Sequence, residues 1–252
     1  MDPNHDYKRN ILGDAYDPAR PVANWLKYRL VAKRTGQDCD RIALADELAK
    51  VHSGPHDASA DTMNSFWTTY ARALELQTGE QFFASRTQLV LDRHDAEGYR
   101  QVNEMFSEFA VLTHTRGNFV LVPMYLPTGA QRRRSLNPVR GGYRSKWRDY
   151  WDLTLASIRA GELNEFFGDN VDDQFNIPKL GGFDGYVRRH HLGAYVDSQG
   201  EVLPLWDGHL DEGAPALPET MVQIEQFLAN VTRAITQRAV ELQQHASVSA
   251  SH

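Results

Sequence analysis

The chain has 252 residues, of which 41% are hydrophobic and 24% are charged, and its formal net charge is -6. These proportions are typical of a folded globular protein and exclude a disordered or fibrous chain. The single cysteine excludes an intrachain disulfide, and no run of about 20 apolar residues could cross a bilayer. The N-terminus lacks the basic start and apolar stretch of a signal peptide, so we expect a cytoplasmic protein with no membrane partner.

Helices are predicted wherever apolar residues recur at helical spacing. The expected ranges are 21–33, 41–51, 61–77, 96–112, 149–167 and a last helix that follows Pro218 and reaches Leu242. In this last helix the apolar residues form one continuous stripe.

A buried strand is predicted at 118–125, because the segment is short and rich in β-branched and aromatic residues. A hairpin is predicted within 194–205, with its turn at 197–200. The expected fold is therefore mainly α with a small β element, an α+β class. We expect a single compact domain over 1–245, with a polar N-terminal arm over about 1–20 and a disordered tail at 246–252.

The distribution of charge is the most informative feature of the sequence. Residues 109–148 contain no Asp or Glu, although the chain has 33 acidic residues, and they hold seven arginines and one lysine. The planar guanidinium group matches phosphate oxygens two at a time, so we interpret this segment as a binding site for a phosphate-bearing ligand. The ligand would be a nucleotide or a short nucleic acid. The alternative interpretation is a solvated loop whose arginines pair with surplus carboxylates.

Acid–base residues flank this basic segment. His114 precedes the predicted strand, and Asp149 and Asp152 open the helix that follows, three residues apart on one face. Together with arginines they could perform acid–base chemistry on a phosphate ester. The competing explanation is structural, because two acids in a first helical turn are what the helix dipole favours.

No sequence motif assigns a cofactor or a metal ion. The chain has no pair of spaced cysteines, no His-Glu-x-x-His motif, no phosphate-binding loop and no dinucleotide glycine fingerprint. The cofactor is therefore left unknown, and no residue is assigned as a metal ligand.

Three motifs, taken together, resemble an uncharacterised family of bacterial cytosolic proteins. They are His-Thr-x-Gly-Asn-Phe from His114, Asn-x-x-Arg-Gly from Asn137, and Asp-x-x-Asp-Leu-Thr-Leu-x-x-Ile-Arg from Asp149. The resemblance covers about residues 14–206. It implies a family grouping and no activity. Residues 116–122 are also similar to a stretch of His-Asn-His nucleases, although no second histidine or acid precedes His114 at close spacing.

The leading hypothesis is thus binding of a phosphate-bearing ligand by the basic segment. One alternative is a metal-assisted phosphodiesterase or nuclease-like hydrolase, and another is an interaction module that docks an acidic partner protein. Whether the chain is an enzyme stays open at this point. The candidate ligand-binding residues are Arg116, Asn118, Asn137, Arg140, Arg144 and Arg159, and the candidate catalytic residues are His114, Asp149 and Asp152.

Overall fold

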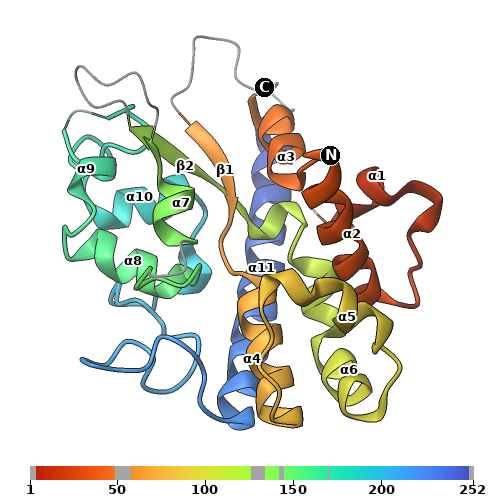
Figure 1. Ribbon diagram of the computed structural model, residues 1–252. Helices are drawn as coiled ribbons and strands as arrows, with labels where there is room; N and C mark the ends of the chain where they lie inside the picture. Colours follow the sequence, from red (N-terminus) through yellow and green to blue (C-terminus); the bar gives the residue numbers. More distant parts are fainter. Residues whose placement is uncertain (1–3, 49–57, 126–133, 142–144, 170, 250–252) are drawn as a thin grey trace.

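The computed structural model describes residues 4–48, 58–125, 134–141, 145–169 and 171–249 (Figure 1). Its α-helices are α1 (Lys8–Leu12), α2 (Pro21–Thr35), α3 (Cys39–Leu48), α4 (Phe66–Thr78), α5 (Thr87–Asp92), α6 (Glu97–Leu112), α7 (Leu136–Arg140), α8 (Trp151–Arg159), α9 (Asn164–Phe167), α10 (Phe183–Arg189) and α11 (Met221–Ser249). Short 3-10 helices are η1 (Gly13–Ala15), η2 (Ala84–Arg86), η3 (Arg116–Asn118) and η4 (Gly193–Tyr195).

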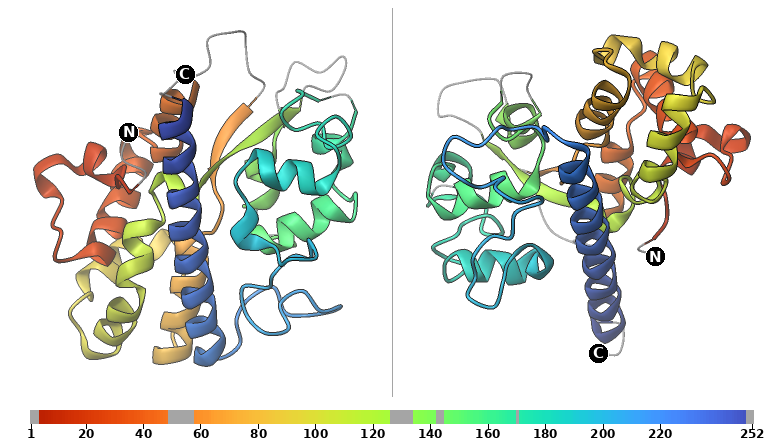
Figure 2. Two further views of the ribbon diagram at one scale, coloured as in Figure 1. Left: turned by 180° about the vertical axis from the view of Figure 1, so that it is seen from behind. Right: turned by 90° about the horizontal axis from the view of Figure 1, so that it is seen from below.

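The sheet is small and antiparallel. Its strands β1 (Ala58–Thr62), β2 (Phe119–Tyr125) and β3 (Arg134–Ser135) lie in the order β1-β2-β3. The expected α+β class, mainly α with a small β element, is confirmed. Seen from below, α11 runs between two groups of helices, with the N-terminal helices on one side and α7–α10 on the other (Figure 2).

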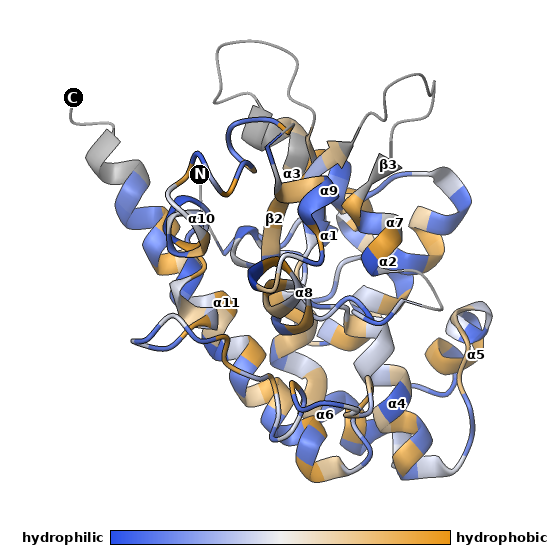
Figure 3. Ribbon diagram, turned by 90° about the vertical axis from the view of Figure 1, so that its left-hand side faces the viewer, coloured by the Kyte–Doolittle hydropathy of each residue, from blue (hydrophilic) through white to orange (hydrophobic). Residues whose placement is uncertain are grey.

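The helices form where the sequence supplies an apolar face and a cap. The α4 helix begins after Ser65, whose hydroxyl accepts a hydrogen bond from the Thr68 amide, and it ends at Gly79 in the left-handed conformation. Apolar and polar residues alternate along α11 (Figure 3). Its buried stripe includes Ile224, Phe227, Val231 and Ile235.

Aromatic side chains dominate the centre of the core. The rings of Trp25 on α2 and Phe66 on α4 lie 4.5 Å apart, and those of Tyr70 and Phe106 lie 5.4 Å apart. These contacts hold α2, α4 and α6 against one another. The burial of these large apolar rings favours the folded state of this three-helix part of the molecule. The hydrophobic β2 strand is covered by helices (Figure 3).

Several helices begin at residues other than those expected, and two of these differences have a clear cause in the backbone. The segment 58–62 is a strand, so α4 starts at Phe66 and not at Asp61. The expected helix over 149–167 begins at Trp151, because Asp149 has a left-handed φ of 61°. It is also divided in two at Gly161, which has a φ of 75°.

The structure also differs in detail from the prediction at the expected hairpin and at both chain ends. Only one isolated bridge, between Val196 and Val202, forms within 194–205. Residues expected in an N-terminal arm pack against the core, since Tyr7 and Lys8 are buried. At the other end α11 continues through Ser249, into the expected tail, and residues 250–252 lie outside the described part. No helix among the described residues is long and apolar enough to cross a membrane.

Candidate functional site

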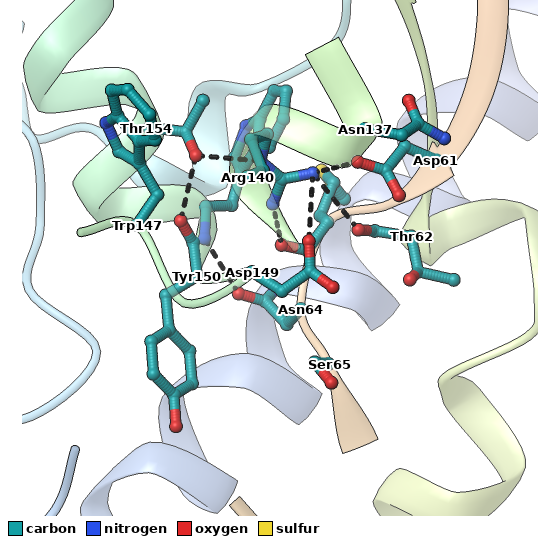
Figure 4. Close-up of polar contacts among 12 residues, drawn as sticks. Asp61, Thr62, Asn64, Ser65, Asn137, Arg140, Trp147, Asp149, Tyr150 and Thr154 are labelled. Atoms are coloured by element: carbon teal, nitrogen blue, oxygen red, sulfur yellow. Dashed lines mark hydrogen bonds and ion pairs between the residues drawn. The ribbon is translucent and has the colours of Figure 1, made fainter. Parts of the chain in front are cut away.

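Among the described residues of the basic segment, the most deeply buried charge belongs to Arg140, at the end of α7. Its guanidinium group forms an ion pair with Asp61 of β1 and donates a hydrogen bond of 2.6 Å to the Met63 carbonyl (Figure 4). Nε donates to the Thr154 hydroxyl on α8 at 2.8 Å. Arg140 therefore ties together the sheet, α7 and α8 from inside the protein.

A second carboxylate, that of Asp149, faces the same guanidinium group. One oxygen of Asp149 lies 3.8 Å from Nη1 of Arg140 (Figure 4). Burial raises the pKa of Asp149, and the positive charge of Arg140 opposes this rise. The pKa of Asp61 is also raised, first by burial, although Arg140 again favours the ionised form. Two carboxylates thus share one buried cation.

Asp149 lies on the wall of a cleft, which we call the His114 cleft, with a volume of about 610 Å³. The walls come from α2, the start of α3, the end of β1, the start of α4, η2 and the residue pair that follows α6. Ionisable side chains are concentrated along them: Arg29, Lys33, Asp38, Asp40, Arg41, His114 and Asp149. Three of these groups lack the polar partner that a desolvated group ordinarily has.

The first is Arg29 of α2. Its guanidinium group lies over the rings of Trp25 and Trp67, 5.5 and 5.1 Å from their centroids. It makes no hydrogen bond or ion pair with the described residues. Burial lowers the pKa of Arg29, which remains a cation at neutral pH. A partly desolvated guanidinium group on an aromatic platform is suited to bind an anionic ligand group.

The second is Asp40, in the first turn of α3. Its carboxyl group has no hydrogen bond or ion pair within the part of the chain that the structure describes. Burial, followed by the nearby carboxylates of Asp38, Asp61 and Asp149, raises the pKa of Asp40 well above its ordinary value of 3.8. Asp40 therefore tends to keep its proton, as a general acid must.

The third is His114, which follows the end of α6 and is only 7% exposed. Its ring packs edge-on against Tyr28 at 4.7 Å and Phe119 at 6.0 Å. The Nδ1 atom has no hydrogen-bond partner among the described residues. Burial and the positive charge of Lys8 lower the pKa of His114 well below 6.5, so its imidazole is neutral at neutral pH.

The backbone of the cleft is strained at Asp149. A φ of 61° is uncommon for a residue other than glycine. The neighbouring chain holds the conformation: the Asp149 amide donates to the Arg140 carbonyl, and the Asp149 carbonyl accepts from the Ser65 amide at 3.0 Å. Strain of this kind clusters at functional sites, where it aims a side chain.

The pKa values of the cleft groups are displaced in opposite directions. The pKa of the Asp40 carboxyl is raised and that of the His114 imidazole is lowered, and such a divergence is typical of a general acid and a general base that share one site. Perturbed groups of this type, placed in a cleft, mark a candidate active site. The described residues contain no group of three or more His, Cys, Asp and Glu side chains placed to hold a metal ion.

The structure brings together two of the three candidate catalytic residues. His114 and Asp149 line the same cleft. Asp152 lies elsewhere, fully buried, where its Oδ2 accepts hydrogen bonds from the Leu205 amide at 2.9 Å and from His209 Nδ1 at 2.6 Å. Asp152 therefore anchors the segment before α11 to α8.

The candidate ligand-binding residues do not meet at one place. Asn118 donates to the Thr113 carbonyl, and Asn137 donates to the Ala60 carbonyl, so both amides join main-chain segments. Arg159 forms an ion pair with Glu201 at the surface. Arg116 lines a separate pocket, described below, and Arg144 lies outside the described residues.

Sequence reasoning does not find Arg29 or Asp40. Arg29 falls within an apolar helix face, and Asp40 is one of two acids, with Asp38, at the start of α3. Their distinguishing property is the lack of a polar partner inside a cleft, which no local sequence pattern reports. Helical spacing does place Arg29 and Lys33 on one face of α2, and this is the signal that the sequence offers.

Comparison with known proteins gives a family without an assigned activity. Comparisons with curated proteins and with solved structures found no match. A family described as a family of unknown function, DUF6994, matches residues 66–242, which include His114, Arg140 and Asp149. Because this match spans most of the chain, the protein belongs to the DUF6994 family.

Proposed function

We propose that the protein is a hydrolase that cleaves a small phosphate ester in the His114 cleft. The observation that carries the proposal is the meeting of Arg29, Asp40 and His114 in one cavity, each lacking a polar partner among the described residues. Desolvated ionisable groups are costly to keep unpaired, and a bound substrate would supply the missing partners.

Each group has a distinct role in this proposal. Arg29, with Lys33 one turn further along α2, holds the anionic phosphate group. His114 accepts a proton from water, and the water oxygen then bonds to phosphorus. Asp40 donates its proton to the leaving oxygen as the bond between phosphorus and that oxygen breaks. Asp149, held by its strained backbone and by Arg140, keeps the pKa of Asp40 raised.

The size of the His114 cleft limits the size of the substrate. A cavity of about 610 Å³ accommodates a small molecule, in the size range of ordinary ligand pockets. The protein's net charge of -6 also disfavours a long polyanion. A short phosphate mono- or diester is therefore preferred over duplex DNA.

The test is hydrolysis of p-nitrophenyl phosphate and bis(p-nitrophenyl) phosphate, with p-nitrophenyl acetate as the neutral ester. The assay is run with EDTA and, separately, with magnesium. We expect turnover of at least one phosphate ester, and we expect Arg29→Gln to lower kcat/KM about tenfold or more through loss of a charged hydrogen bond.

Arg34→Gln is the matched control, because Arg34 is an exposed residue of the same helix and does not line the cleft. It should leave kcat/KM unchanged. The proposal fails if neither phosphate ester is hydrolysed above the buffer rate, or if the two variants are equally impaired.

A further inference from the structure

A second cavity, which we call the Arg189 pocket, lies between β2, the end of α10 and α11. Its volume is about 230 Å³, and its basic lining residues are Arg116, Arg189, His190, His191 and Arg238. No Asp or Glu is among the described residues that line it. The pocket belongs to neither the Arg140 network nor the His114 cleft.

Arg238 of α11 holds the walls of this pocket together. It is only 5% exposed, and its Nη1 donates to the carbonyls of Gly117 at 3.0 Å and Phe119 at 2.6 Å. Its Nε donates to the His190 carbonyl at 3.2 Å. One guanidinium group therefore fixes both the start of β2 and the end of α10, so the pocket is preorganised.

Arg189 supplies an accessible charge at the end of α10. Its side chain is exposed and makes no hydrogen bond or ion pair with the described residues. Arg188, the preceding residue, is also exposed but does not line this pocket. The two neighbouring arginines are thus both exposed, and only Arg189 lines the pocket.

Burial and the neighbouring positive charges together keep the two histidines of the pocket neutral at neutral pH. Burial and then the charges of Arg238 and Arg189 lower the pKa of His190 to about 4. The pKa of His191 is also lowered to about 4, first by burial and then by His245, Arg238, Arg116 and Arg189. The guanidinium groups that line the pocket add to this lowering, and their charge, with no acid among the described lining residues, favours an anion.

His191 also has a left-handed backbone, with a φ of 54°. Its ring packs edge-on against that of His245 on α11, 4.4 Å between centroids. The conformation is uncommon outside glycine and places a strained residue at the pocket wall.

We infer that the Arg189 pocket binds a small phosphate-bearing ligand with an apolar portion. Arg189 contacts the phosphate group, while Arg116 and Arg238, which line the same cavity, contribute positive charge from its wall. The apolar portion packs against Phe119, Val120 and Leu121, which line the same cavity. The small, partly enclosed volume excludes a nucleic acid strand. This site is separate from the proposed catalytic cleft and does not depend on hydrolysis there.

The test uses phenylphosphonate, which cannot be hydrolysed at a phosphate ester bond, and phenol as its neutral counterpart. Binding to the full chain is measured by isothermal titration calorimetry at low ionic strength, where screening is weak. We expect phenylphosphonate to bind and phenol not to bind. Arg189→Gln should weaken phenylphosphonate binding about tenfold or more, the effect of losing a charged hydrogen bond.

Arg188→Gln is the matched control and should change the Kd less than about twofold, since the residue is outside the pocket. Arg29→Gln separates the two sites, and binding at the Arg189 pocket should persist in it. The inference is overturned if phenylphosphonate does not bind, if the Arg188 and Arg189 variants behave alike, or if only Arg29→Gln abolishes binding.

An NMR titration of the histidines gives a second readout that does not depend on a variant. A bound anion offsets the surrounding guanidinium charges, so phenylphosphonate should raise the pKa of His190 and His191 from about 4. Unchanged pKa values at a saturating concentration would place the ligand elsewhere.

Discussion

Arg140 and Asp61 form an ion pair that is buried from solvent and joins positions 79 residues apart. The pair connects α7 to the end of β1, next to the turn that leads into α4. Because Asp149 also faces Arg140, the pair sets the charge at the base of the His114 cleft. Arg140, a fully buried arginine of the basic segment, is therefore part of the framework of the candidate active site.

Replacement of Arg140 by methionine should destabilise the fold strongly. It leaves Asp61 buried without its cation, and breaking a buried pair from one side costs about 3–5 kcal/mol. Urea unfolding followed by circular dichroism measures the free energy of unfolding. The Asp61→Asn/Arg140→Met double variant should regain part of this loss, since Asp149 is then the only one of the two carboxylates left without the Arg140 cation. Equal stability of wild type and Arg140→Met would show that the pair is unimportant.

Asp152→Ala should reduce stability without impairing the chemistry. Its carboxylate accepts hydrogen bonds from Leu205 and His209 in the interior, and their loss costs about 1–3 kcal/mol. Thermal unfolding checks the stability, and the turnover rate of the folded protein, measured well below Tm, checks the chemistry. If the variant instead kept the Tm of the wild type and lost about two orders of magnitude in turnover rate, Asp152 would be a catalytic residue.

Gly117→Ala should destabilise the contact between η3 and α11. An added Cβ would lie 2.5 Å from the Ile235 carbonyl oxygen, so the helix or the turn must shift, at a cost of about 1–3 kcal/mol. Gly98→Ala is the control, because its Cβ would meet only the Thr78 methyl group at 3.5 Å. That helical substitution should leave stability unchanged or raise it by up to about 1 kcal/mol. Similar unfolding curves for the two variants would contradict this account of Gly117.

The pH dependence of hydrolysis should have two limbs. The active form has Asp40 protonated and His114 neutral. The pKa of His114 is lowered, so kcat/KM should fall only on the acid side, as the imidazole gains a proton. The pKa of Asp40 is raised, so kcat/KM should fall again on the alkaline side, as the carboxyl loses its proton.

Asp40→Asn should remove the alkaline limb from the residual activity, whereas Asp14→Asn, at an exposed surface position, should keep both limbs. Rates measured over a series of buffers at constant ionic strength check this. A rate that simply increases with pH in the wild type would mean that a protonated Asp40 is not required.

Much of the helical architecture could be predicted from the sequence. The α6 and α11 helices follow directly from apolar residues at helical spacing, as with Phe106 and Phe109 or Ile224 and Phe227. The β1 strand could not be predicted, because Ala58–Thr62 has little intrinsic preference for a strand. It is a strand because Ala58 and Thr62 pair with Pro123 and Phe119 of β2, a tertiary effect.

The candidate site could be predicted only in part. Residue type and position nominate His114 and Asp149, and the structure places both in one cleft. The sequence of the acid-free segment could not show that Arg140 is buried in an ion pair, since its partner, Asp61, lies in a distant part of the chain. Asp40 and Arg29 are not among the residues predicted from the sequence. Their distinguishing property is the lack of a hydrogen-bond or ion-pair partner among the described residues, which only the structure reveals.

The most direct test of the proposed function is the turnover rate of Asp40→Asn with the best phosphate ester substrate, measured beside Asp14→Asn. Asparagine preserves the shape of the side chain and removes the acidic proton, so we expect the turnover rate to fall by about two orders of magnitude or more with the fold intact. Asp14→Asn should match the wild type. A turnover rate for Asp40→Asn equal to that of the wild type would contradict proton donation by Asp40 in the His114 cleft.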